Sequence, residues 1–142
     1  MSATGLEVFD HTLQTTNIWL DDLMVHLGWT DRRKAFHALG VVLHSLRDRI
    51  PVNSAAHLSA QLPMLIRGLF FEGWQPASAP LKERTVDQFL THITEAFLFD
   101  TETDCRSIVR GVFHVLAKHI SPGEIQKIQS VLPAGVREFW IE

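Results

Sequence analysis

Residues 42–70 read VLHSLRDRIPVNSAAHLSAQLPMLIRGLF, and this stretch decides the fold because a related version of it follows later in the chain. Shifting the sequence by 70 positions places residues 42–70 on residues 112–140 without a gap. Unrelated amphipathic helices share only their apolar phase, so matching polar and proline positions indicate an internal duplication. Seven pairs are identical: Val42/Val112, His44/His114, Leu46/Leu116, Ile50/Ile120, Leu62/Leu132, Pro63/Pro133 and Arg67/Arg137.

Apolar residues recur at three- and four-residue steps along nearly the whole chain, which is the spacing of amphipathic helices. Helix boundaries are also recognisable: Gly28 follows a helix end, Thr85 and Gln88 form a capping box, and Ser121 caps a helix that begins with Pro122. The sequence has no strand-like alternation of useful length. We therefore predict an all-α fold, a compact helical domain built from two pseudosymmetric four-helix units.

The length of 142 residues favours one domain, which at this size buries about two-thirds of its unfolded surface. Residues 74–82 contain two prolines and show no periodicity, as expected of a linker. We expect a single domain over residues 1–142, with repeats at about 6–73 and 83–142 joined by this linker. Units this small and apolar would need one another for a core.

Composition excludes several classes of protein. The net charge is −3, so no basic surface for nucleic acid is expected, and no apolar run approaches the roughly 20 residues that span a bilayer. The single cysteine, Cys105, rules out an intrachain disulfide and favours a reducing compartment. The first residues lack the regions of a signal peptide. We expect a cytoplasmic protein that binds neither nucleic acid nor membrane.

The eight histidines are unusual for this length, yet no two of them lie three or four residues apart, as metal ligands on one helix would. We therefore predict no metal and no cofactor. His44 and His114 occupy equivalent repeat positions and could face one another around a shared ligand or proton. We favour the alternative that they are helix-surface residues inherited by duplication. Protonation of all eight histidines would move the formal charge from −3 to +5, which makes pH sensing a third hypothesis.

No nucleophile elbow, phosphate-binding glycine loop or Rossmann glycine cluster is present, and Cys105 lies on the apolar phase of its helix. We predict no catalytic residues and lean against an enzyme. The polar residues that remain surround the first Leu-Pro step. Arg67 either locks the helix–proline–helix corner or binds an anion, and the repeat position favours locking. Arg47 and Asp48 differ from their repeat partners, so a binding site, if present, is predicted at His44, His114, Arg67, Arg47 and Asp48.

Residues 68–74 read GLFFEGW and place three aromatic side chains at a helix end. One helix stripe cannot bury both Phe70 and Phe71 on one side. Either this helix is sandwiched between the two units, or a ring belongs to an oligomer interface. We favour packing between the units and keep Phe70, Phe71 and Trp74 as the candidate interface.

Three segments together carry a resemblance to a known family: VLHSLRDRIP at 42–51, AHLSAQLP at 56–63 and LIRGLFFEGW at 65–74. They resemble the bacterial domain of unknown function 2267 family, and HISPGE at 119–124 and Leu132-Pro133 match its second half. The resemblance covers roughly residues 8–140. It implies a small, all-helical, bacterial cytoplasmic protein, and it transfers no catalytic residues because the family carries no established activity.

The sequence thus favours a non-enzymatic interaction or structural protein that associates with itself or with a protein partner. The alternative is a small-molecule- or metal-binding protein, with or without enzymatic activity, whose pocket lies between the two helical units.

Overall fold

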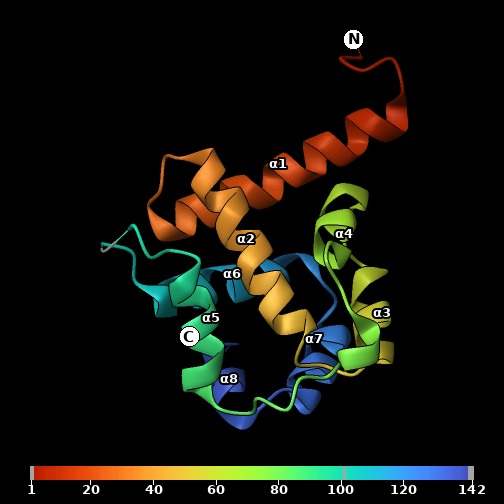
Figure 1. The fold of residues 1–142 in the computed structure, drawn as a ribbon. Coiled ribbons are helices and arrows are strands. Elements are labelled where there is room, and N and C mark those ends of the chain that lie inside the picture. The colour runs from red at the N-terminus through yellow and green to blue at the C-terminus, as the bar shows by residue number, and fades with distance from the viewer. Residues whose placement is uncertain (1, 101, 141–142) are drawn as a thin grey trace.

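A computed structural model describes residues 2–100 and 102–140 of the chain, and over these residues every regular element is a helix. The predicted all-α class is confirmed. None of the described helices is long and apolar enough to cross a membrane. The order of elements (Figure 1) is α1 Glu7–Leu27, α2 Arg32–Arg47, α3 Val52–Ser59, α4 Met64–Phe71, the 3-10 helix η1 Pro76–Ser78, α5 Val86–Glu95, α6 Cys105–His119, α7 Pro122–Val131, α8 Ala134–Arg137 and the 3-10 helix η2 Glu138–Trp140.

Most helix boundaries follow from local capping chemistry. Gly28 ends α1 in the left-handed region at φ 70°, which a side chain would disfavour. Thr85 and Gln88 form the predicted capping box of α5, and the Ser121 hydroxyl accepts a hydrogen bond from the backbone N–H of Glu124. Asn53 is a residue type that often caps a helix, but α3 starts directly after Pro51, so Asn53 lies inside it.

Helix α2 is enclosed by other helices along most of its length. It contacts α1, α4, α5 and α6, so its apolar stripe meets neighbours on several sides. Burying each leucine-sized side chain contributes about 1.5–3 kcal/mol relative to leaving it in water. Its fully buried apolar side chains are Ala35, Ala38, Leu39, Val42, Leu43 and Leu46.

Helix α1 crosses over α2 and packs along α6 (Figure 1). The approach to α6 is close because Gly111 has no side chain: a Cβ at this position would lie 3.0 Å from Leu27 and 3.1 Å from Leu23. At the other end of the fold, α3 packs against α7, and α5 packs against α2, α6 and α8.

Each Leu-Pro corner is locked by an arginine four residues further along the chain. Arg67 donates to the carbonyl oxygens of Ser59 and Leu62, at 2.9 and 3.0 Å, and so satisfies carbonyls at the end of α3. Arg137 donates to the carbonyl oxygen of Leu132 at 3.1 Å, at the end of α7. The guanidinium of Arg67 therefore locks the helix–proline–helix corner, which is the alternative that the repeat position favoured.

Helix α1 is also tied to the start of α4. Pro63 precedes α4 and supplies no side-chain cap, so the first N–H groups of α4 need an acceptor from elsewhere. The hydroxyl of Thr12, a buried residue of α1, accepts a hydrogen bond from the backbone N–H of Leu65 at 3.0 Å. One helix thus caps another that lies about 50 residues away in sequence.

This cap can be tested with Thr12→Val, which keeps the shape of the side chain and removes its hydroxyl. We expect the free energy of unfolding in urea to fall by about 1–2 kcal/mol, because a partly buried N–H loses its acceptor. Thr15→Val is the matched control, since the Thr15 hydroxyl only bonds the carbonyl of His11 in its own helix. Equal losses in the two variants would contradict the cap.

Candidate functional site

Three consecutive charged residues follow the last turns of α2, and two of them are almost fully enclosed. Arg47 is 4% exposed, and its Nε donates to a carboxylate oxygen of Asp48 at 2.8 Å. Its Nη1 donates to the carbonyl oxygens of Phe70 and Glu72, at 2.9 and 2.8 Å. The guanidinium therefore closes the C-terminal end of α4, where helix carbonyls lack partners of their own.

Arg49 is 1% exposed and forms an ion pair with Glu83, the residue that follows the linker. Its Nη2 donates to Glu83 at 2.6 Å and its Nη1 to the carbonyl of Ser45 at 3.0 Å. Burial lowers the pKa of the Arg49 guanidinium below its ordinary value, and the carboxylate of Glu83 opposes that shift. Arg84 donates to the carbonyls of Arg49 and Val131, so the end of the linker is fastened to both halves of the chain.

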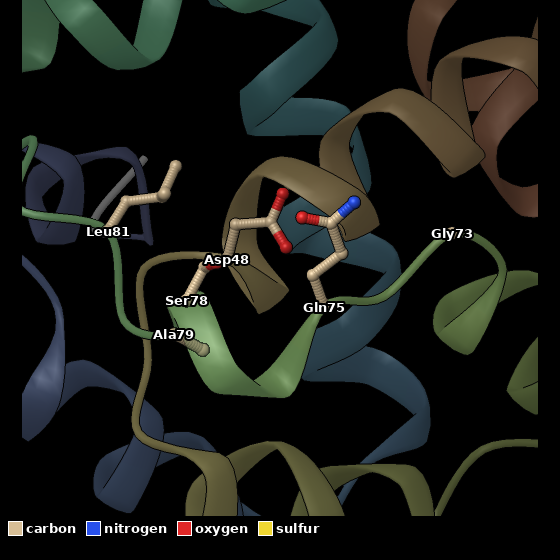
Figure 2. A pocket seen from close by; sticks show the side chains of 6 residues that line it. All are labelled: Asp48, Gly73, Gln75, Ser78, Ala79 and Leu81. Carbon is tan, nitrogen blue, oxygen red and sulfur yellow. The ribbon is translucent and has the colours of Figure 1, made fainter.

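A cavity of about 260 Å³ lies where residues 73–81 pass the end of α2. Figure 2 shows the carboxylate of Asp48 and the side-chain amide of Gln75 turned toward one another across it. Ser78 lies on η1, and the backbone N–H of Leu81 donates to the carbonyl of Asp48 at 2.7 Å. The residues lining this cavity are Asp48, Gly73, Gln75, Ser78, Ala79 and Leu81.

The five predicted binding residues do not all meet at this cavity. Asp48 lines it, and Arg47 holds the Asp48 carboxylate in place. His44 bonds the carbonyl of Leu69 at 2.6 Å through Nε2, which links α2 to α4. Arg67 lines a different cavity, between α1 and α4. His114 lies on α6 and stacks on His26 of α1.

The α1–α6 contact carries a polar cluster of its own. The rings of His26 and His114 stack with centroids 4.4 Å apart. One turn earlier, Asp22 accepts hydrogen bonds from Lys118 at 2.9 Å and from His119 at 2.6 Å. Burial opposes ionisation of Asp22, but these two bonds leave the pKa of its carboxyl below the ordinary value. Within residues 2–100 and 102–140, no three histidine, cysteine or carboxylate side chains gather as metal ligands.

The three aromatic residues at the end of α4 contact one another and pack on the core. Phe70 is fully buried, and the rings of Phe71 and Trp74 are partly buried with centroids 5.0 Å apart. Of the candidate interface, only Phe71 and Trp74 therefore retain surface that another molecule could touch.

A larger apolar surface lies on the first turns of α1 and on α4. Figure 1 shows the start of α1 extending beyond the rest of the fold. Val8 and Met64 line a cavity of about 390 Å³ between these helices, together with Arg67 and His11. We call the following six side chains, which are 38–53% exposed, the α1–α4 surface: Leu6, Val8, Phe9, Leu13, Met64 and Leu65.

Sequence reasoning missed several residues of these sites. Gln75 and Ser78 lie in the stretch interpreted only as a linker, and its polar residues were the signal that could have marked them. Arg49 and Glu83 are 34 residues apart, and no periodic pattern connects them. Cys105, expected in the core, is partly buried at the first position of α6.

Comparison with protein families gives one match over most of the chain. The model of a family described as "Uncharacterized conserved protein (DUF2267)" matches residues 16–139. A comparison with curated proteins found no match.

The stacked histidines predict a pH-dependent stability. Burial and the nearby charge of His114 lower the pKa of His26 below its ordinary value of 6.5. The unfolded chain then binds this proton more readily than the folded chain. The stabilisation is complete above about pH 6.5 and is lost as the pH falls from there through the lowered pKa.

We therefore expect His26→Phe, which can still stack on His114, to lose less stability than the parent chain when the pH is lowered from 7.5 to 5.5. Urea unfolding at each pH measures the difference. His57→Phe, at an exposed position of α3, serves as the control and should follow the parent chain. A His26→Phe variant with the parent pH dependence would contradict the assignment.

Proposed function

The chain belongs to the DUF2267 family of uncharacterized conserved proteins, and we propose that it is a non-enzymatic interaction protein that associates with itself through the α1–α4 surface. The proposal rests on the inward face of α1, which continues past the part of the helix that the core covers. The inward face of α1 is buried at Thr12, Thr16 and Leu23, yet the same face remains open at Val8 and Phe9.

Exposed apolar side chains are ordinary when they are scattered, and informative when they are gathered. Val8 and Met64 line one cavity, and Leu65 is bonded to Thr12 through its backbone. The stripe Leu6, Phe9 and Leu13 repeats at helical spacing. Together these side chains resemble the apolar centre of an interface, while Glu7, His11 and Arg67 supply a polar rim.

A second copy of the chain suits this surface because its charges are complementary under a twofold axis. Glu7 is the first residue of α1, and Arg67 lies on α4 beside the α1–α4 surface. Two of the three guanidinium nitrogens of Arg67 bond carbonyls at the end of α3, and Arg67 also lines the cavity between α1 and α4. Antiparallel packing of two α1 helices would bring Glu7 close to Arg67 of the partner subunit, in both directions at once.

We also propose that the domain arose by duplication of a four-helix unit, with repeats at about 6–73 and 83–142 joined by residues 74–82. The hydrogen bond from Arg67 Nη2 to the carbonyl of Leu62 recurs, shifted by 70 positions, from Arg137 Nη2 to Leu132. Helix contacts support the same relation. A twofold relation between the repeats would exchange α1 with α5, α2 with α6 and α3 with α7. The α1–α6 contact then corresponds to the α5–α2 contact, and the α2–α6 and α3–α7 contacts each correspond to themselves.

We also propose that the protein is bacterial and located in the cytoplasm, on the basis of the family resemblance. The alternative function, binding of a small molecule, has one specific observation in its favour: the cavity beside Asp48.

Self-association can be tested with Leu13→Asp, because Leu13 is 42% exposed at the middle of the α1–α4 surface. We expect the dimer dissociation constant, measured by sedimentation equilibrium, to rise at least about tenfold, since a charge would be buried in an apolar contact. Val25→Asp places the same residue on the same helix at an 82% exposed site outside the surface. It should associate as the parent chain does.

Circular dichroism should show equal helicity for both variants. A parent chain that stays monomeric at high concentration, or a Leu13→Asp variant that associates normally, would contradict the proposal.

A further inference from the structure

We propose that the cavity beside Asp48 is a binding site for the primary ammonium group of a small aliphatic amine, held by Asp48, Gln75 and Ser78. This site is separate from the α1–α4 surface and does not depend on self-association. Asp48 follows α2, and Gln75 and Ser78 lie on the segment that passes its end.

The acceptors around the cavity match the donors of a primary ammonium group. The cavity is bordered by the Asp48 carboxylate, the Gln75 amide and the Ser78 hydroxyl, each of which offers an acceptor oxygen. Figure 2 shows the amide oxygen of Gln75 directed toward the Asp48 carboxylate. A primary ammonium has three N–H donors and no acceptor, so it can satisfy one oxygen of each residue.

The charge on the wall of the cavity is negative. Asp48 is the only residue with a formal charge among the six that line the cavity. Arg47 pairs with the Asp48 carboxylate through Nε, its Nη1 bonds the carbonyls of Phe70 and Glu72, and the guanidinium of Arg49 is paired with Glu83. Helices α2 and α4 both end beside this segment, and helix C-termini favour a cation.

The Asp48 carboxylate, and the backbone turn that carries Gln75 and Ser78, are already held in place. The Asp48 carboxylate is fixed by Arg47 Nε, and the Asp48 carbonyl accepts from Leu81 at 2.7 Å. The backbone N–H of Ser78 donates to the carbonyl of Gln75 at 3.0 Å, which fixes the turn that carries both side chains. A prearranged set of acceptors loses little entropy when it takes up a ligand.

The shape of the cavity limits the rest of the ligand. A volume of about 260 Å³ is small for a ligand site and suits a short chain. The remaining wall consists of Gly73, Ala79 and Leu81, which offer no charged or polar side chain. A short alkyl chain attached to the ammonium fits this wall better than a sugar or a phosphate does.

The experiment is an NMR titration of the full chain with n-butylamine, which carries a positive charge at pH 7 as lysine does. We expect saturable shifts of the backbone amide signals of Asp48, Gln75 and Ser78. 1-Butanol lacks the charge and tetramethylammonium lacks the N–H donors, so both should bind at least tenfold more weakly. No saturable shift with n-butylamine, or equal binding of 1-butanol, would overturn the proposal.

Two variants separate binding from folding. Asp48→Asn keeps an oxygen that can accept from Arg47 Nε and removes the negative charge, so the affinity for n-butylamine should fall at least tenfold in a folded chain. Glu95→Gln removes an exposed carboxylate on α5 and should bind as the parent does. Should Asp48→Asn fail to fold, Gln75→Leu, at an exposed loop position, replaces it with the same expectation. Unchanged affinity in the folded variant would overturn the site.

The same titration distinguishes two sources of the ammonium group. Tighter binding of N-acetyl-lysine-methylamide than of n-butylamine would assign the site to a lysine side chain of a protein. Tighter binding of n-butylamine would assign it to a free amine. Both results support ammonium recognition, and weak, non-saturable shifts with both compounds would contradict it. Repeating the titration in the Leu13→Asp chain keeps this result independent of self-association.

Discussion

The burial of α2 is the constraint on which the rest of the structure depends. Four other helices pack against it, and the two arginines at its C-terminal end, Arg47 and Arg49, are buried. Three charged residues, Arg47, Asp48 and Arg49, stand at that end. Charges removed from water are costly unless they are paired and hydrogen-bonded, so the surrounding chain has to supply partners for each of them.

The partners come from two directions. Arg47 takes the carbonyls at the end of α4, and Arg49 takes Glu83 from beyond the linker. Residues 73–84 are consequently drawn across the end of α2, and Leu81 is bonded there through its backbone. The cavity beside Asp48 is therefore a consequence of the way the buried arginines are satisfied.

The sequence predicted those features that depend on neighbouring residues. Helical spacing, the Thr85–Gln88 capping box, the Gly28 terminus and the Ser121 cap all act within one turn, so their residue types reveal them. The role of Arg67 could also be foreseen, because its carbonyl partners belong to the adjoining helix.

Features that depend on packing between distant segments could not be predicted. The stack of His26 on His114 and the ion pair of Arg49 with Glu83 each require two helices or a loop to meet, and no local pattern encodes that meeting. The exposure of Val8 and Phe9 also depends on packing between distant segments. Their apolar phase predicts burial, but α1 is longer than the body it covers, so its first turns extend past their neighbours.

The central claim is that these overhanging turns are covered by a second copy of the chain. Double electron–electron resonance between nitroxide labels tests it most directly. The label is attached at the position of Gln14, an exposed site on α1, in a Cys105→Ser background. Packed helices lie about 8–10 Å apart, so the account predicts a narrow, short distance between the two labels. A label at Lys127 on α7, on the other side of the fold (Figure 1), should give a much longer distance. No dipolar coupling at Gln14, or a shorter distance at Lys127, would contradict the account.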